Sequence, residues 1–124
     1  MGYHVIDPGD IDPLSDRPVD ARSISDAAGL ENVGVRLYEA EPGEQLPLAY
    51  HVHEKQEELF YVLAGTLHVE TPEQEYVVET GETFVAEPTH PHRAHNPENA
   101  QDTVRVLAIG APAVSDASPY DPDA

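Results

Sequence analysis

The chain has 124 residues; 24 are Asp or Glu, 6 are Lys or Arg, 7 are His and none is Cys, so the formal net charge is −18. The length predicts one domain, and the lack of Cys excludes disulfides, thiolate metal ligands and a Cys nucleophile. Basic side chains are too few for phosphate contacts, so we expect no nucleic-acid partner. No apolar run approaches the roughly 20 residues of a transmembrane helix, so we expect no membrane partner. The first residues lack the features of a secretory signal, so we expect a cytoplasmic protein.

In chain order, residues 1–30 are rich in Pro and Asp and predict an extended arm with little core of its own, apart from a short strand at Tyr3–Ile6. Apolar segments separated by turn residues follow, and each predicts a strand; they are 33–38, 59–63, 67–69, 76–78, 83–86 and 104–109. The continuous apolar run at 59–63 indicates a strand buried on both faces. Residues 111–124 read as a polar tail. Many short strands with no long helical pattern predict an all-β sandwich or barrel.

Histidines carry the functional signal, because six of the seven lie between residues 51 and 95. His51 and His53 are two residues apart, so on a strand both imidazoles point to the same side. Glu58 stands at the head of the most apolar strand, where a carboxylate must be paired or bound to a cation. His92 follows in a second His-rich segment. Two or three imidazoles with one carboxylate suit a divalent Fe, Mn, Ni, Co, Cu or Zn ion.

At these residues the sequence resembles the cupin family. His51-Val-His53, four residues, Glu58, six residues and Gly65 match most of the first cupin motif. Gly81 and His92, with ten residues between them, and Asn96, after three more, match the length of the second motif. Two loops depart from the pattern: Gly43 lies seven residues before His51, and Pro88 is one place late, with His90 near the position of a family glycine.

The resemblance implies a double-stranded β-helix, or jelly-roll barrel, over residues 31–112, with an N-terminal arm at 1–30 and a C-terminal tail at 113–124. Carried over by position, it also implies four metal ligands: His51, His53, Glu58 and His92. Glu57 competes with Glu58 as a ligand, but the spacing to Gly65 favours Glu58.

The remaining candidates are less specific. His90 is the candidate general base, although it departs from the motif; His95 and His68 are expected on the outer faces of their strands. Asn96 is expected to order a turn. A further group either lines the pocket or packs in the core; it consists of Arg36, Tyr50, Phe60 and Phe84.

Two function classes remain open. The first is a metal-dependent enzyme acting on a small, chelating, oxygenated substrate, with a dioxygenase-like oxidoreductase preferred over an isomerase. The second is a small-ligand-binding module with a structural metal. A vestigial barrel without metal is disfavoured by the intact ligand spacings.

Two expectations concern the whole molecule. The acidic excess, with a single lysine at Lys55, is typical of a halophile's cytoplasm, where molar salt reduces the screening length to about 3 Å. An ordinary acidic protein is the alternative. Small barrels of this kind pair their sheet edges, so we expect a homodimer, with residues 1–30 available to cross to the partner.

Overall fold

The computed structural model describes residues 2–15 and 18–123. Within these residues short antiparallel strands dominate and helix is limited to two short pieces. In chain order the elements are η1 (Pro8–Asp10), β1 (Asp20–Ser23), α1 (Ile24–Ala28), β2 (Gly34–Ala40), β3 (Gln45–His53), β4 (Glu57–Ala64), β5 (Thr66–Glu70), β6 (Glu75–Glu79), β7 (Thr83–Ala86), β8 (His92–His95), β9 (Val104–Ala111) and β10 (Ala117–Pro119).

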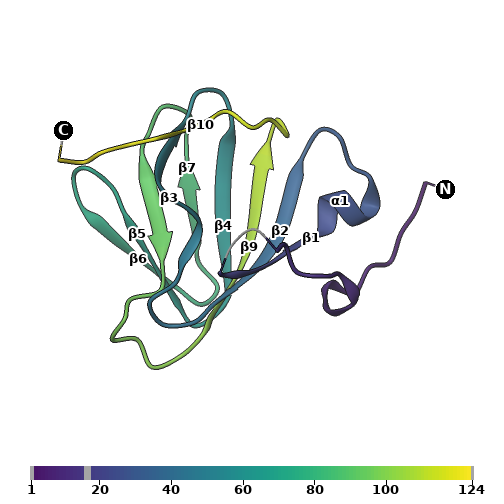
Figure 1. Cartoon of the computed structure of the whole chain (residues 1–124), viewed down its shortest axis with the longest axis horizontal. Coiled ribbons are helices and arrows are strands. Elements are labelled where there is room, and N and C mark those ends of the chain that lie inside the picture. The colour runs from purple at the N-terminus through teal and green to yellow at the C-terminus, as the bar shows by residue number, and fades with distance from the viewer. Residues whose placement is uncertain (1, 16–17, 124) are drawn as a thin grey trace.

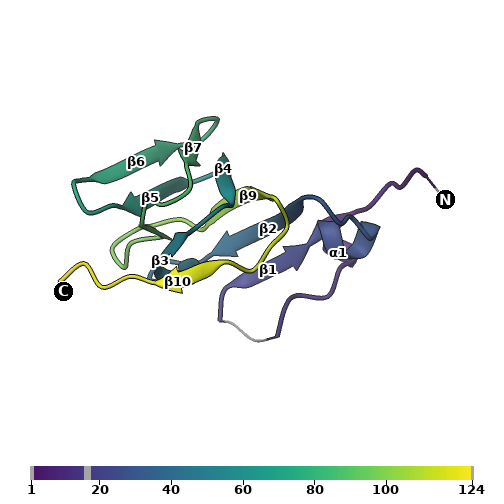
Figure 2. The same ribbon diagram turned by 90° about the horizontal axis from the view of Figure 1, so that it is seen from above.

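The strands form two five-stranded antiparallel sheets that face each other (Figures 1 and 2). One sheet has the order β1-β2-β9-β4-β7, and the other has the order β10-β3-β8-β5-β6. From β2 onward the chain passes repeatedly between the two sheets, with the β5–β6 hairpin as the exception. This is the jelly-roll, double-stranded β-helix arrangement, so the predicted all-β fold class is confirmed.

The space between the sheets is filled by alternate residues of the strands. Phe60 and Val62 of β4 meet Leu67 and Val69 of β5 there, and all four side chains are inaccessible to solvent. The turn between these strands requires Gly65, which has φ +78° and lies so close to the next loop that a Cβ would stand 2.6 Å from the Thr103 carbonyl oxygen. The two sheets are therefore held at contact distance at this end of the barrel.

Strand β4 is buried on one face only, which corrects the prediction of burial on both. Tyr61 is 38% exposed and Leu63 is 39% exposed, whereas Phe60 between them is fully buried. The outer face of this sheet is nevertheless apolar: Leu59 pairs with Val85 on β7 and with Ile109 on β9. The apolar run at 59–63 thus reflects an apolar outer face of the sheet as well as a buried inner face.

The segment predicted as an N-terminal arm contains secondary structure. No strand forms at Tyr3–Ile6, but β1 and α1 lie inside the segment predicted as an arm, and β1 pairs with β2. Val19 is 1% exposed and Ala21 is fully buried, so this stretch contributes to the core. Small residues such as Ala21 and Ser23 alternate too weakly in hydropathy to reveal the strand. The N-terminal end of the chain extends away from the barrel (Figure 2), whereas Leu14 packs against the core and donates its N–H to the Ala21 carbonyl at 2.8 Å.

The C-terminal tail also contains structure. Residues 117–119 form the edge strand β10, which pairs with β3 so that Ala117 opposes His53 and Pro119 opposes His51. Proline is tolerated at a sheet edge because its missing N–H need not face a neighbouring strand. Strand β10 therefore lies directly beside the two histidines of β3, although the division into arm, domain and tail stays a prediction.

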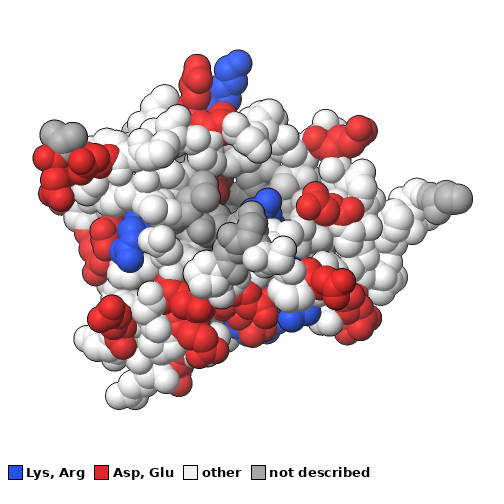
Figure 3. Space-filling view, in the orientation of Figure 1, with Lys and Arg blue, Asp and Glu red and all other residues white. Residues whose placement is uncertain are grey.

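Acidic side chains are spread over the face shown in Figure 3, and basic ones are few. Within the described part of the chain, no helix is long and apolar enough to cross a membrane.

Candidate metal centre

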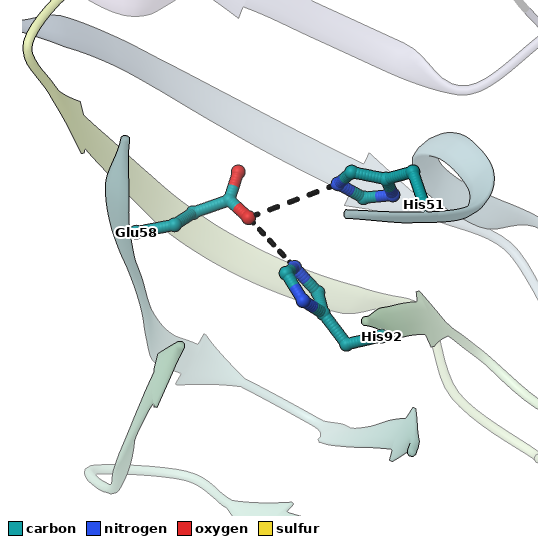
Figure 4. A group of neighbouring side chains, drawn as sticks. All are labelled: His51, Glu58 and His92. Atoms are coloured by element: carbon teal, nitrogen blue, oxygen red, sulfur yellow. Dashed lines mark hydrogen bonds and ion pairs between the residues drawn. The ribbon is translucent and has the colours of Figure 1, made fainter. Parts of the chain in front are cut away.

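Three strands bring the four predicted ligands together inside the barrel. His51 and His53 lie on β3, Glu58 begins the inward face of β4, and His92 begins β8. His51 and His92 are direct partners across the β3–β8 ladder. Figure 4 shows the side chains of His51, Glu58 and His92 pointing toward one another from these strands. The imidazoles are 8% exposed or less, so the cluster is almost fully removed from solvent.

One carboxylate oxygen is the common neighbour of the three rings. Glu58 Oε1 lies 2.7 Å from His92 Nε2, 3.6 Å from His53 Nε2 and 3.9 Å from His51 Nε2. Ligand atoms of His51, Glu58 and His92 all lie within 4.8 Å of one another. His53 stands slightly outside this tighter group but faces the same oxygen.

Each histidine is oriented by an acceptor at its other ring nitrogen. Nδ1 of His51 lies 2.8 Å from the Ala49 carbonyl, and Nδ1 of His92 lies 3.0 Å from the His90 carbonyl. Nδ1 of His53 lies 2.8 Å from Oδ1 of Asp116. Since carbonyl and carboxylate oxygens only accept, Nδ1 must carry the hydrogen in all three rings. The Nε2 lone pairs are then directed toward the centre, as in metal-binding histidines whose outer nitrogen is hydrogen-bonded.

The unpartnered nitrogens fit a cation. Among the described residues, the buried Nε2 atoms of His51 and His53 have no hydrogen-bond partner. Buried polar atoms are normally satisfied, so such orphans need an explanation. His92 donates from Nδ1 and also faces Glu58 through Nε2, so it needs either a second proton or a cation at that position. A divalent ion with three imidazoles and one carboxylate satisfies all of these atoms at once.

The electrostatics of the cluster favour charge separation within it. The Glu58 carboxylate, 3.6 Å from His53 Nε2, raises the pKa of His53 against the effect of burial, and Asp116 adds to this effect. Burial favours the neutral form of Glu58, but the three neighbouring imidazoles of His51, His53 and His92 outweigh burial and hold its pKa far below the usual range. Glu58 is therefore ionised throughout the neutral pH range.

A cavity of about 540 Å³ opens onto the cluster. His51, His53 and Glu58 form part of its wall, and polar groups from β2 and the β3–β4 loop, including Arg36, Tyr38 and Gln56, form another part. The Arg36 guanidinium donates to the Tyr38 hydroxyl at 3.3 Å. Among the described residues lining this cavity, Arg36 is the only Lys or Arg. The pocket thus offers one cationic side chain for an anionic group, in a wall that also contains the carboxylates of Asp26 and Glu58.

The candidate base His90 lies elsewhere. Its side chain is exposed, its Nδ1 contacts the Pro88 carbonyl at 2.9 Å, and it lines a second depression together with His92. It serves the cluster through its backbone, because its carbonyl orients His92. The preceding residue, Thr89, has φ +71° and donates its N–H to the His53 carbonyl at 2.7 Å. A catalytic role for the His90 side chain stays a prediction.

The remaining sequence candidates occupy the positions expected of them, with one exception. Glu57 is exposed, and His68 and His95 lie on the face of their strands that is turned away from the barrel interior. Asn96 is 2% exposed and donates to the carbonyls of Ala40 and Asp102, so it orders the end of β8 as predicted. Phe60 packs in the core. Arg36 is the exception, because it lines the cavity rather than packing in the core.

One functional residue escapes sequence reasoning. Asp116 accepts from His53 at 2.8 Å, from the Lys55 N–H at 2.6 Å and from the Gln56 N–H at 3.1 Å. These hydrogen bonds outweigh burial, which acts in the opposite direction, and lower its pKa to about 2. Asp116 is 63 residues from His53 in the sequence and lies in a polar segment, so no local pattern marks it as a support of the cluster.

Comparison with known proteins supports the fold. A sugar phosphate isomerase of the cupin superfamily from Silicibacter pomeroyi superimposes with a TM-score of 0.75 and 23% identity over 87% of this chain and 75% of its own. The polyketide cyclase RemF from Streptomyces resistomycificus gives a TM-score of 0.80 with 18% identity over 96% of this chain and 86% of its own.

A predicted sugar phosphate isomerase from Acidithiobacillus ferrooxidans is 29% identical, with a TM-score of 0.67, over 75% of this chain. This chain spans only 58% of the length of that protein. No curated protein matches the sequence. The family description "Cupin domain" matches residues 36–110, which include all four predicted ligands and more than half of the chain. The chain therefore belongs to the cupin family.

Proposed function

We propose that this chain binds a divalent transition metal through His51, His53, Glu58 and His92 and acts as a metal-dependent enzyme on a small, anionic, oxygen-rich substrate. The observation that carries the proposal is the convergence of three oriented Nε2 atoms on Glu58 Oε1, two of them buried and unpartnered. When bound, a metal at this position supplies a Lewis acid for a substrate that chelates it through two oxygens.

The cavity supports an anionic substrate. Arg36 offers a planar guanidinium, which binds carboxylate and phosphate groups through paired hydrogen bonds. It lines the same cavity as His51, His53 and Glu58. A substrate that contacts both the metal and Arg36 is held at two points, and this fixes its orientation relative to Glu58.

Among reactions, isomerisation of a hydroxy-carbonyl substrate bearing a phosphate has the most support. Two similar structures carry the description sugar phosphate isomerase, one of them at 29% identity. The chemistry is also compatible with Arg36 as the site for the phosphate. Such a reaction moves a proton between neighbouring carbons and needs no external oxidant.

A dioxygenase-like oxidoreductase is the second candidate. The tightest ligand group, His51, Glu58 and His92, has the two-histidine, one-carboxylate composition that is typical of non-haem iron oxygenases. This reaction differs from the first in requiring dioxygen, so the two are separable by experiment.

The first experiment is elemental analysis of untagged protein purified without chelator. We expect metal in the wild-type protein and a large loss from the barrel centre in Glu58→Gln, which keeps the size of the side chain and removes its charge. His4→Gln is the matched control, because His4 is exposed and far from the cluster in the fold. Equal metal affinity at the barrel centre in Glu58→Gln and wild type would contradict the proposed ligand set.

The second experiment assays the metal-loaded protein on a panel of aldose and ketose phosphates, with and without oxygen. Anaerobic interconversion that is lost in both Glu58→Gln and Arg36→Gln supports the isomerase. Turnover that consumes oxygen supports the oxidoreductase instead. Saturable binding of these compounds without turnover in either atmosphere indicates a binding module and overturns the enzymatic proposal.

A further inference from the structure

A second group of metal-ligand side chains lies on the outside of the barrel. His68 and Glu70 are on β5, Glu75 is on β6 and His95 is on β8. The strand register brings them together, because His68 opposes His95 and Glu70 opposes Glu75. Their inward neighbours Leu67, Val69 and Ala94 are fully buried, so this group, which we call the outer cluster, lies on the opposite face of the sheet from the barrel centre.

Ligand atoms of Glu70, Glu75 and His95 all lie within 4.8 Å of one another, and His68 adjoins this group through Glu75. The Glu75 carboxylate reaches His68 Nδ1 at 3.4 Å through Oε2 and His95 Nε2 at 3.3 Å through Oε1. His95 Nε2 is also 3.5 Å from Oε1 of Glu70. Tetrahedral zinc with bonds of about 2.1 Å places neighbouring ligand atoms about 3.4 Å apart. These contacts are at the long limit for hydrogen bonds, so the histidines are not tightly committed to their carboxylates.

The surroundings hold the carboxylates in place and leave the charge negative. Arg93 donates to Glu70 Oε1 at 2.6 Å and to the Gln45 side chain at 2.8 Å, which anchors Glu70 beside His95. With neutral imidazoles, two carboxylates and one guanidinium leave a local charge of about −1, on a molecule whose net charge is −18. A divalent cation is therefore attracted to the cluster both locally and by the molecule as a whole.

The cluster is also accessible. The Glu75 side chain is 47% exposed and that of His68 is 24% exposed, whereas the His95 ring is only 12% exposed. One ligand is thus fixed near the sheet and the others can adjust from the solvent side. This differs from the barrel centre, where all the ligands are held inside the fold.

We infer that His68, Glu75 and His95, together with Glu70, form a second divalent-metal site that accepts zinc or a similar ion and links strands β5, β6 and β8. Imidazole and carboxylate ligands suit zinc, nickel, copper and cobalt. The site is independent of the proposed function, because His92 and His95 lie on opposite faces of β8.

The test measures zinc binding to the full-length chain by calorimetry and by equilibrium dialysis with elemental analysis. We expect two zinc ions per wild-type chain and one in the double variant His68→Asn/His95→Asn. His4→Asn, which removes an exposed imidazole outside both clusters, should keep two. The surface variant does not touch the core, and circular dichroism checks that it folds.

A complementary variant separates the two sites. Glu58→Gln should lose the ion of the barrel centre and keep the ion of the outer cluster. When cobalt is used as the probe, the absorption spectrum of this variant should vanish only when His68 and His95 are also replaced. Unchanged zinc stoichiometry and affinity in His68→Asn/His95→Asn would overturn the outer site and show that the cluster is only an ion-pair network. Loss of all zinc in Glu58→Gln would overturn it as well, whereas failure of the barrel centre alone would leave it standing.

Discussion

At the scale of single residues, Asp116 supports the proposed metal centre without being one of its proposed ligands. It fixes the hydrogen on His53 Nδ1 and is itself held by the N–H groups of Lys55 and Gln56. Partners of this kind orient metal-binding histidines and increase their basicity. The carboxylate therefore links the C-terminal segment to the ligand set.

Replacing Asp116 by Asn should weaken metal binding at the barrel centre by about 10- to 100-fold, because the ring loses its charged acceptor. Competition with a chromophoric chelator measures the change. Asp121→Asn is the control, since Asp121 lies in the same segment and contacts only the backbone of Asp123 in the described structure. Equal affinities for Asp116→Asn and Asp121→Asn would mean that Asp116 has no role in the site.

The pH dependence of metal binding follows from the same contacts. Protons and metal compete for the Nε2 atoms, so affinity must fall as the imidazoles become protonated. The pKa of His53 is raised by Glu58 and Asp116, which places the onset of competition above the ordinary imidazole value of about 6.5. Glu58 does not limit binding, because its pKa is lowered and it stays ionised. Metal content should be constant above this range and decline below it.

Dialysis against a fixed concentration of free metal at a series of pH values, followed by elemental analysis, measures this decline. The His68→Asn/His95→Asn background restricts the signal to the barrel centre. Occupancy that stayed constant down to about pH 4.5 would be incompatible with three histidine ligands.

At the scale of elements, the turn between β4 and β5 sets the distance between the sheets. Gly65→Ala imposes two penalties: a left-handed backbone, which costs about 1–2 kcal/mol in a residue with a Cβ, and a clash with the Thr103 carbonyl oxygen at 2.6 Å. Gly81→Ala is a matched control, since Gly81 has φ +88° but open space around its missing Cβ. Urea unfolding should show a larger loss for Gly65→Ala than for Gly81→Ala. Equal losses of unfolding free energy in the two variants would mean that the clash with the Thr103 carbonyl contributes nothing.

The elements also show what local sequence determines. Strands β2, β4, β5, β6, β7 and β9 follow from apolar alternation and turn residues. The spacing of His51, His53, Glu58 and His92 matches a motif that reflects local strand geometry. Strands β1 and β10 escape such reasoning, because Ala21 is small and Pro119 is unfavourable within a sheet. Strand β1 is positioned by its pairing with β2, and β10 is positioned by its pairing with β3. In each pair the two strands are separated by loops or by a long stretch of sequence.

The two proposed metal sites illustrate the same limit. The barrel centre is visible in sequence because its ligands form a motif, whereas Asp116 is joined to it only by the path of the C-terminal segment. The outer cluster depends on the β5–β6 and β5–β8 registers, which place His68 opposite His95 and Glu70 opposite Glu75. Registers between strands are tertiary information, so His68 and His95 read from the sequence only as outward-facing side chains.

At the scale of the whole molecule, the outer face of the β1-β2-β9-β4-β7 sheet is where we predict that a partner binds. Tyr61, Leu63 and Val85 are 38%, 39% and 62% exposed, and Leu107 and Ile109 lie beside them on β9. A contiguous apolar patch on an otherwise acidic surface indicates an interface. A second copy of the chain suits it, because a two-fold axis brings the same patch together from both sides.

We predict a homodimer through this face at about 2 M KCl, where the repulsion between two chains of net charge −18 is screened. Leu63→Lys/Val85→Lys should weaken dimerisation by at least tenfold, or about 1.4 kcal/mol, because it places charges inside an apolar interface. Val77→Lys is the control, since Val77 is 54% exposed on the outer face of the other sheet. Light scattering across a range of protein concentrations measures the association.

The salt dependence separates the apolar contact from the charge that opposes it. Lowering the salt should dissociate the wild-type dimer, since the Debye length grows from about 3 Å at 1 M to about 10 Å at 0.1 M and the acidic surfaces then repel. If apolar burial alone governed the dimer, its association would change little over this range of salt. A monomeric mass at about 2 M KCl would exclude the dimer. A dimer that Leu63→Lys/Val85→Lys leaves intact would place the interface elsewhere. The edge strands and residues 2–15 would then be the next surfaces to vary.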